Sequence, residues 1–224
     1  MSLHELPDLI QGTDEWHDQR RGILTASVVG QLITPSTVKP ANNDKARAIT
    51  AQLAAERITG WTDPTYMNDD MLRGVEDEPR AIDVYSEHYA PVTTTGFMVR
   101  DDWGFKIGYS PDGLVGNDGL IEVKSRRPKK HLQTILADEV PPENMAQLQC
   151  GLLVSGREWI DYVSYCGGMP LYLKRVRPDA KWHKAIVDAA TAFEEAVSQM
   201  VASYETAATE MPMTERVLEE EMVI

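Results

Sequence analysis

Hydrophobic and polar residues along the chain follow two alternating patterns, one with helical spacing and one with short strand-like runs. Helical spacing predicts four helices in the first part of the chain, at residues 14–22, 26–33, 44–59 and 68–89. Thr13 is a favourable N-cap for the first helix, and Gly60 is a favourable end for the third. Pro79 should begin a new helix or kink the fourth. Residues 35–43 are predicted to form a loop.

The second part of the chain begins with short β-rich segments separated by Gly, Asp and Asn, a pattern typical of an antiparallel meander. The predicted strands are residues 91–100, 103–113, 119–125, 157–166 and 169–176. A helix is predicted at 143–155. Trp182, Ile186, Ala189, Phe193, Val197, Met200 and Tyr204 recur at helical spacing and predict a last helix with a buried face. This order of elements favours an α/β or α+β domain with a mixed central β-sheet flanked by helices.

Composition places the chain among globular proteins. Its 224 residues fit one large domain, which we assign to residues 1–204, and 42% of them are apolar. No apolar run approaches the roughly 20 residues that span a bilayer, and the first residues lack a signal-peptide pattern. We therefore expect a cytoplasmic protein without a membrane partner. Two cysteines, Cys150 and Cys166, are too few for a four-cysteine metal site, so a metal would be held by oxygen ligands.

Net charge at first argues against a nucleic-acid-binding protein, because it is −13. However, residues 205–224 contain six Glu and one Arg, so about −5 belongs to an acidic tail that we expect to be partly disordered. Positive charge is concentrated elsewhere, at Lys124, Arg126, Arg127, Lys129 and Lys130. Local charge matters most for phosphate binding, because salt largely screens charges that lie more than about 8–10 Å away. This basic run is either a DNA or partner contact or a solvated turn.

Two neighbouring segments carry charged residues that could form one site: the first contains a carboxylate, and the second contains a carboxylate and a lysine. Asp112 follows a predicted strand, and Glu122 and Lys124 lie two apart on the next strand, where alternate residues share a face. Ile121 and Val123 should point into the core on the other face. One explanation is an exposed ion pair worth under about 1 kcal/mol.

The other explanation is a metal-dependent phosphodiesterase site. Carboxylates on adjacent strands can converge on a hard cation such as Mg²⁺, which prefers oxygen ligands. The cation stabilises charge on the phosphate and activates a bound water. A neighbouring lysine can orient that water or stabilise the charged transition state.

Pro111-Asp112, followed after nine intervening residues by Glu122-Val123-Lys124, resembles the motif of PD-(D/E)xK nucleases. Three more blocks resemble motifs of the phage lambda exonuclease family, in the order of that family: residues 16–27, 73–81 and 145–149. The four blocks span roughly two-thirds of the chain and are together far more specific than any one of them. The resemblance implies a restriction-endonuclease-like fold.

The resemblance also implies roles for individual residues. Asp112, Glu122 and the Val123 carbonyl would bind Mg²⁺, with Mn²⁺ as a substitute, and Lys124 would position or activate water. Glu78 would complete the acidic site, with one or two metal ions. Gln147 would lie near the metal, although Gln149 competes for this role. Residues that would hold the 5′ phosphate of a DNA end are Arg20 and Ser27, assisted by Thr25 and Ser110.

The activity implied is 5′→3′ digestion of one strand of linear double-stranded DNA to 5′-mononucleotides, as in phage recombination by single-strand annealing. The family resemblance further implies a homotrimeric ring around DNA and an annealing protein as partner. A basic channel in such a ring would be compatible with an acidic outer surface. Two alternatives remain: another PD-(D/E)xK nuclease such as an endonuclease, and a non-enzymatic DNA-end-binding or DNA-mimicking protein.

Overall fold

The computed structural model describes residues 2–64 and 66–216. Its helices are α1 (Asp14–Arg20), α2 (Ala26–Val29), α3 (Asp44–Thr59), α4 (Asp69–His88), α5 (Pro128–Ala137), α6 (Pro142–Ser155) and α7 (Ala180–Ala208), with one 3-10 turn, η1 (Gly30–Leu32). Its strands are β1 (Leu3–Leu6), β2 (Leu24–Thr25), β3 (Ile33–Thr34), β4 (Lys39–Pro40), β5 (Val92–Thr93), β6 (Phe97–Arg100), β7 (Ile107–Tyr109), β8 (Gly113–Val115), β9 (Gly119–Ser125), β10 (Trp159–Tyr165) and β11 (Tyr172–Val176).

The described strands form two main sheets and one small hairpin. One sheet has the order β1-β6-β7-β2 and the other has the order β11-β10-β9-β8-β5, while β3 pairs with β4. Parallel pairs, β2 with β7 and β9 with β10, occur beside antiparallel ones in both main sheets. The predicted mixed sheet flanked by helices is confirmed.

The predicted three-strand meander is wrong. Strands β6 and β7 pair in the first sheet, whereas β8 and β9 pair in the second, so the chain changes sheets between Tyr109 and Gly113. Pro111 lies in this segment, and a proline cannot donate the hydrogen bond that would continue a ladder. Ser110 and Asp112 therefore lie at the junction of the two sheets.

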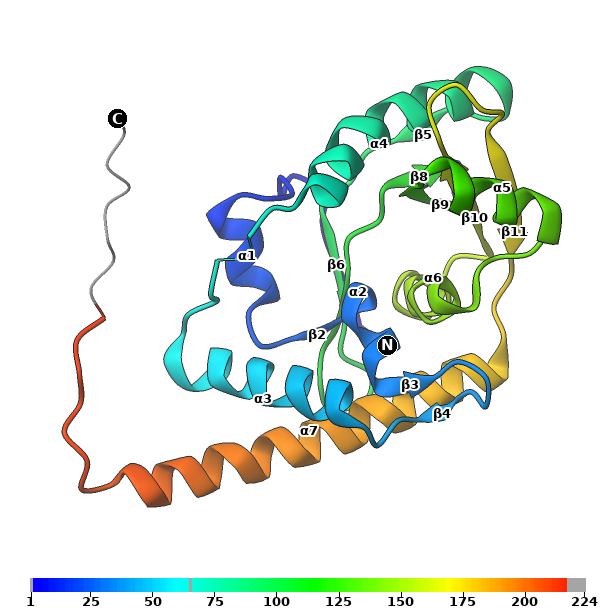
Figure 1. Cartoon of the computed structure of the whole chain (residues 1–224). Coiled ribbons are helices and arrows are strands. Elements are labelled where there is room, and N and C mark those ends of the chain that lie inside the picture. The colour runs from blue at the N-terminus through cyan, green and yellow to red at the C-terminus, as the bar shows by residue number, and fades with distance from the viewer. Residues whose placement is uncertain (1, 65, 217–224) are drawn as a thin grey trace, which may run out of the picture.

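Helices cover the sheets on opposite sides. In Figure 1, α3 and α7 run side by side below the strands, and α4 runs above them. Leu120 of β9 belongs to the main core with Leu148 of α6. Ile121 and Val123 of the same strand belong to a second core cluster with Tyr85 of α4. Strand β9 is therefore buried between α4 and the layer that contains α6.

Several predicted boundaries are wrong. The second helix ends at Val29, continues only as a 3-10 turn, and leads into the β3–β4 hairpin where a loop was predicted. Pro79 lies inside helix α4, so no new helix begins there, whereas the alternative of a kink in this helix stays a prediction. Its C-terminal half packs on β9, and this tertiary contact offsets the missing backbone hydrogen bond. Helix α5 and strand β1 were not predicted: β1 has only four residues, and the basic residues at the start of α5 were interpreted as a charged run.

The last helix is longer and less buried than the sequence suggests. Helix α7 reaches Ala208, so the beginning of the proposed acidic tail is helical. Its residues Trp182 and Phe193 are buried, but Met200 and Tyr204 are 39% and 43% exposed, so the predicted apolar stripe is core only in its first part. Beyond the helix, Arg216 lies over the Trp61 ring. Residues 217–224, which belong to the predicted disordered tail, lie outside the described part of the chain.

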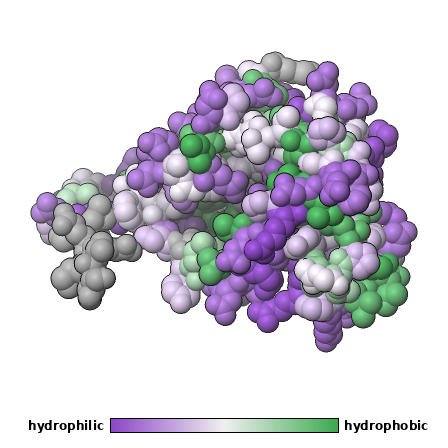
Figure 2. Space-filling model, turned by 90° about the horizontal axis from the view of Figure 1, so that it is seen from above, coloured by the Kyte–Doolittle hydropathy of each residue, from purple (hydrophilic) through white to green (hydrophobic). Residues whose placement is uncertain are grey.

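No helix within the described residues is both long and apolar enough to cross a lipid bilayer. Viewed from above, the surface is mostly hydrophilic, with hydrophobic atoms in separate patches (Figure 2).

Truncating Leu120 should destabilise the protein strongly, because its side chain is completely buried in the main core. We expect Leu120→Ala to lower the free energy of unfolding by about 2–5 kcal/mol in urea denaturation. Leu136→Ala is the control, because that side chain is 76% exposed and should change the value by about 0.5 kcal/mol or less. Equal effects of the two substitutions would contradict the assignment of β9 to the core.

Candidate active site

Strand β9 carries a charged pair on the face that points toward α6. The Lys124 Nζ donates a hydrogen bond of 2.6 Å to Glu122 Oε1. The Glu122 side chain is only 2% exposed and that of Lys124 is 24% exposed, so this is not a solvated surface pair. A buried charge is costly unless it is paired, which is the reason the lysine and the glutamate lie together.

Helix α6 brings an amide to the same carboxylate. The Gln147 Nε2 donates to Glu122 Oε1, and the Tyr109 hydroxyl of β7 lies 3.5 Å from Oε2. Gln149, the competing candidate, instead donates to the Arg177 carbonyl and accepts from the Asp179 N–H. The structure thus places Gln147, and not Gln149, at the charged pair.

Asp112 reaches β9 from the junction of the two sheets. Its Oδ2 accepts a 2.6 Å hydrogen bond from the backbone N–H of Val123. This contact fixes the Asp112 carboxylate beside the segment that carries Glu122 and Lys124. The convergence predicted from strand spacing is therefore present, although the two strands concerned belong to different sheets.

The charged side chains in this region shift one another's pKa values where a shift is seen, at Asp112, Glu78 and Lys124. Burial raises the pKa of Asp112 well above its ordinary value, and the negative charges of Glu122 and Glu78 raise it further. Burial likewise raises the pKa of Glu78, with Glu122 adding to the effect and Lys124 opposing it. Glu78 on α4 is therefore close enough to interact electrostatically with Glu122 and Asp112. Burial opposes the charge of Lys124, but Glu122 and Asp112 outweigh it and raise the lysine pKa.

This donor set fits a hard divalent cation. Its groups are carboxylate oxygens that repel one another in a poorly solvated place, and a cation would relieve that repulsion. Across residues 2–64 and 66–216, no three His, Cys, Asp or Glu side chains are already arranged as a set of ligands. Instead, Lys124 and Gln147 bind Glu122. A bound cation would compete with these two donors for the glutamate.

A second polar cluster forms around Arg20 at the end of α1. Arg20 Nη1 donates to Ser110 Oγ at 3.1 Å, and Nη2 donates to Ser27 Oγ at 3.3 Å. Ser27 Oγ also lies 3.0 Å from Thr25 Oγ1. All four residues expected at a 5′ phosphate thus lie together, and Ser110 joins the other three from a distant position in the sequence.

Trp16 belongs to this cluster, although the sequence suggested no role for it. Its ring centroid lies 3.9 Å from the Arg20 guanidinium carbon, and its Nε1 donates to Ser110 Oγ at 3.0 Å. Burial lowers the pKa of Arg20 to about 10, with Glu56 opposing the shift, so the guanidinium remains charged near neutral pH. The ring therefore holds the charged group in place. Its position in the same sequence block as Arg20 was the available signal.

The Arg20 cluster and the carboxylate cluster are joined by a very short piece of chain. Ser110 belongs to the first cluster and Asp112 to the second, and only Pro111 separates them. The buried proline restricts the backbone of this connection. A ligand bound by Arg20 and Ser110 would consequently lie near Asp112.

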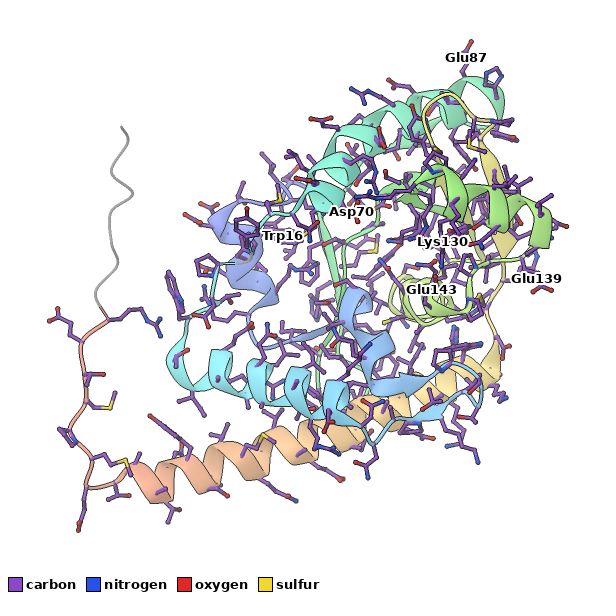
Figure 3. The ribbon with its side chains drawn as sticks, in the orientation of Figure 1. Trp16, Asp70, Glu87, Lys130, Glu139 and Glu143 are labelled. Carbon is purple, nitrogen blue, oxygen red and sulfur yellow. The ribbon has the colours of Figure 1, made fainter. Side chains whose placement is uncertain are left out.

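Much of the basic run serves internal contacts. Arg126 Nη2 donates to Asn144 Oδ1 of α6 at 2.7 Å, and Arg127 Nη2 pairs with Asp70 of α4 at 2.7 Å. Lys130 pairs with Glu143, and Figure 3 shows the two residues near each other on α5 and α6. These contacts tie α4, α5 and α6 to the end of β9, while Lys129 is exposed.

Removing the Asp112 charge should stabilise the protein in the absence of metal. Because folding raises the Asp112 pKa, this group reduces stability as pH rises from its unfolded pKa, about 3.9, through its folded pKa. We expect Asp112→Asn, which retains an oxygen for the Val123 N–H, to raise the free energy of unfolding in EDTA by about 0.5–2 kcal/mol at neutral pH. Denaturation near pH 4 should show a smaller gain, and a loss of stability at neutral pH would refute this electrostatic interpretation.

Comparisons with known proteins identify a family and solved structures with a similar fold. The family of YqaJ-like viral recombinase domains matches residues 15–158. The crystal structure of an alkaline exonuclease, LHK-Exo, from Laribacter hongkongensis superimposes with a TM-score of 0.79 at 30% identity, covering 89% of this chain and 100% of that one. A phage-related exonuclease from Haemophilus somnus 129PT has a TM-score of 0.62 at 15% identity, covering 81% and 96% of the two chains, and supports the fold alone.

No curated protein matches the chain. The matched region covers more than half of the sequence and includes the carboxylates, Lys124, Gln147 and the Arg20 cluster. The chain therefore belongs to the YqaJ-like viral recombinase family, the lambda exonuclease-like group of PD-(D/E)xK nucleases.

Proposed function

We propose that this recombination nuclease is a Mg²⁺-dependent exonuclease that digests one strand of linear double-stranded DNA in the 5′→3′ direction, releasing 5′-mononucleotides. The observation that carries the proposal is the short connection between the two clusters, from Ser110 to Asp112. An anion held at Arg20 would lie beside the carboxylates, so a terminal phosphate would place the first phosphodiester near them. Arg matches phosphate well because its planar donors form paired hydrogen bonds.

The residues that would hold Mg²⁺ are Asp112, Glu122 and the Val123 carbonyl, with Glu78 completing the site for one or two ions. Mn²⁺ would substitute for it. When bound, the ion supplies charge stabilisation on the phosphate and lowers the pKa of water. Buried carboxylates with raised pKa values support this assignment, because such groups gain most from a nearby cation.

Lys124 would orient the attacking water and stabilise negative charge that develops on the phosphate. Its pKa is raised by Glu122 and Asp112, so it carries a proton when no cation competes for those carboxylates. Gln147 would hold Glu122 and the water in position, because its amide already contacts the glutamate. The terminal phosphate would lie between Arg20 and Ser27, with Thr25 and Ser110 as further donors.

Exonucleolytic release of single nucleotides is supported by the Laribacter enzyme, whose structure has also been determined in complex with dAMP. A homotrimeric ring around DNA and a single-strand annealing partner remain part of the proposal. They rest on the lambda exonuclease-like family, in the setting of phage-type recombination in a bacterial cytoplasm. The ring would bring basic side chains toward DNA while the acidic surfaces face outward.

The first test is a digest of 5′-phosphorylated linear duplex and closed-circular duplex. We expect degradation of the linear DNA with Mg²⁺ and none with Ca²⁺ or EDTA, because the carboxylates alone cannot activate water. Analysis of the products should show 5′-mononucleotides. Cleavage of the closed circle would favour the endonuclease alternative, and the absence of any cleavage would favour a DNA-end-binding or DNA-mimicking protein.

The second test concerns Lys124. We expect Lys124→Ala to reduce the single-turnover rate by a factor of about 10²–10³ or more, because charge stabilisation at the phosphate is lost. Lys174→Ala is the matched control, since that lysine forms an exposed pair with Asp138 on another part of the fold. Circular dichroism should show both variants folded. Full activity of Lys124→Ala would rule out the proposed chemistry.

A further inference from the structure

We infer that Glu56 and Arg57 of α3 are positioning residues that set the preference of the enzyme for 5′-phosphorylated DNA ends. Both residues form hydrogen bonds with the backbone of Gly22, and we call this pair of contacts the clamp. Gly22 lies in the turn between Arg20 and the hydroxyl residues Thr25 and Ser27 of the Arg20 cluster. The inference deepens the proposed function and rests on its phosphate site. Neither residue lies in the sequence blocks that suggested the site.

The backbone of Gly22 is held on both sides by α3. Its N–H donates to Glu56 Oε2 at 2.8 Å, and its carbonyl accepts from Arg57 Nε at 2.7 Å. Gly22 has a φ of +65°, and a Cβ at this position would lie 2.5 Å from Arg57 Cγ. The turn therefore requires glycine for its backbone conformation and for the close approach of α3.

This turn determines how the phosphate ligands face one another. Arg20 precedes Gly22 at the end of α1, whereas Thr25 and Ser27 follow it. Arg20 and Ser27 nevertheless approach to 3.3 Å across the turn that contains Gly22. A change in the turn would move the guanidinium relative to the hydroxyls, and phosphate binding depends on that separation.

The clamp is anchored in the core of the fold. Glu56 is 7% exposed, and Gln52 of the same helix donates to its other oxygen. Arg57 also forms two hydrogen bonds of 2.7 Å with Glu194 of α7, so the clamp is linked to α7, which runs beside α3 below the strands (Figure 1). Its rigidity thus comes from the packing of α3 on α7.

Two other interpretations of Glu56 make different predictions. If Glu56 acts mainly through its charge, which raises the pKa of Arg20, then Glu56→Gln should behave like Glu56→Ala. If Glu56 acts only on stability, then its removal should affect phosphorylated and unphosphorylated ends equally. Positioning by the hydrogen bond to Gly22 predicts that glutamine, which keeps an acceptor oxygen, rescues the preference.

The experiment compares kcat/KM on linear duplexes with a 5′-phosphate and with a 5′-hydroxyl, using the full chain with Mg²⁺. We expect the wild type to prefer the phosphate, and Glu56→Ala to reduce this ratio by about 10-fold or more, mainly through KM. Glu56→Gln should keep the ratio within about 3-fold of wild type, which corresponds to under 1 kcal/mol. Gln149→Ala is the matched control, because that buried side chain also binds backbone groups but lies outside the clamp.

Arg57→Met tests the clamp independently, should Glu56→Ala fail to fold, because Arg57 is 32% exposed and less essential for packing. Arg57→Met should also reduce the ratio of kcat/KM for 5′-phosphorylated over 5′-hydroxyl duplex, while this ratio stays at the wild-type value in Gln149→Ala. An unchanged ratio in both clamp variants, or a ratio lost equally in Glu56→Gln, would overturn the inference alone. A wild type without any preference would overturn the phosphate site itself, and the inference with it.

Discussion

Repulsion among three carboxylates is the constraint that organises this structure. Asp112, Glu122 and Glu78 come from the junction of the sheets, from β9 and from α4. Burial together with the charges of Glu122 and Glu78 raises the pKa of Asp112, and burial together with the charge of Glu122 raises the pKa of Glu78. Lys124 is the internal cation that balances them, at 2.6 Å from Glu122. Such a cluster is unfavourable for a folded protein on its own, and it becomes favourable when a divalent cation shares its oxygens.

The neighbouring elements are arranged so that this cluster can be tolerated. One face of β9 contacts α4 through Ile121 and Val123, and the other faces α6, which supplies Gln147. Polar contacts at the end of β9 fix α4 in place, where Ser125 donates to Asp77 at 2.7 Å and accepts from Arg73 at 3.0 Å. These contacts hold α4 against the end of β9, so the carboxylates of Glu78 and Glu122 stay near each other, where a bound cation would reduce their repulsion.

The sequence predicted the fold class and the strand alternation at the candidate site, but not the pairing of the strands. Alternation along β9 correctly placed Glu122 and Lys124 on one face, because the strand period depends only on local geometry. The change of sheet at Pro111 and the hairpin of β3 and β4 were missed, since pairing partners are chosen by tertiary contacts. Glu56 carries no sequence motif, and its role depends on a turn that only the packing of α3 brings within reach.

A direct measurement of the central claim is the number of protons released when Mg²⁺ binds. Calorimetric titration in two buffers of different ionisation enthalpy gives this number at each pH. Because the pKa values of Asp112 and Glu78 are raised without metal, we expect proton release on binding at pH values below those raised pKa values, less release as pH rises above them, and a smaller release in Asp112→Asn, which keeps only Glu78. Binding of Mg²⁺ with no proton release at any pH, or equal release in Asp112→Asn, would contradict a site built from mutually repelling carboxylates.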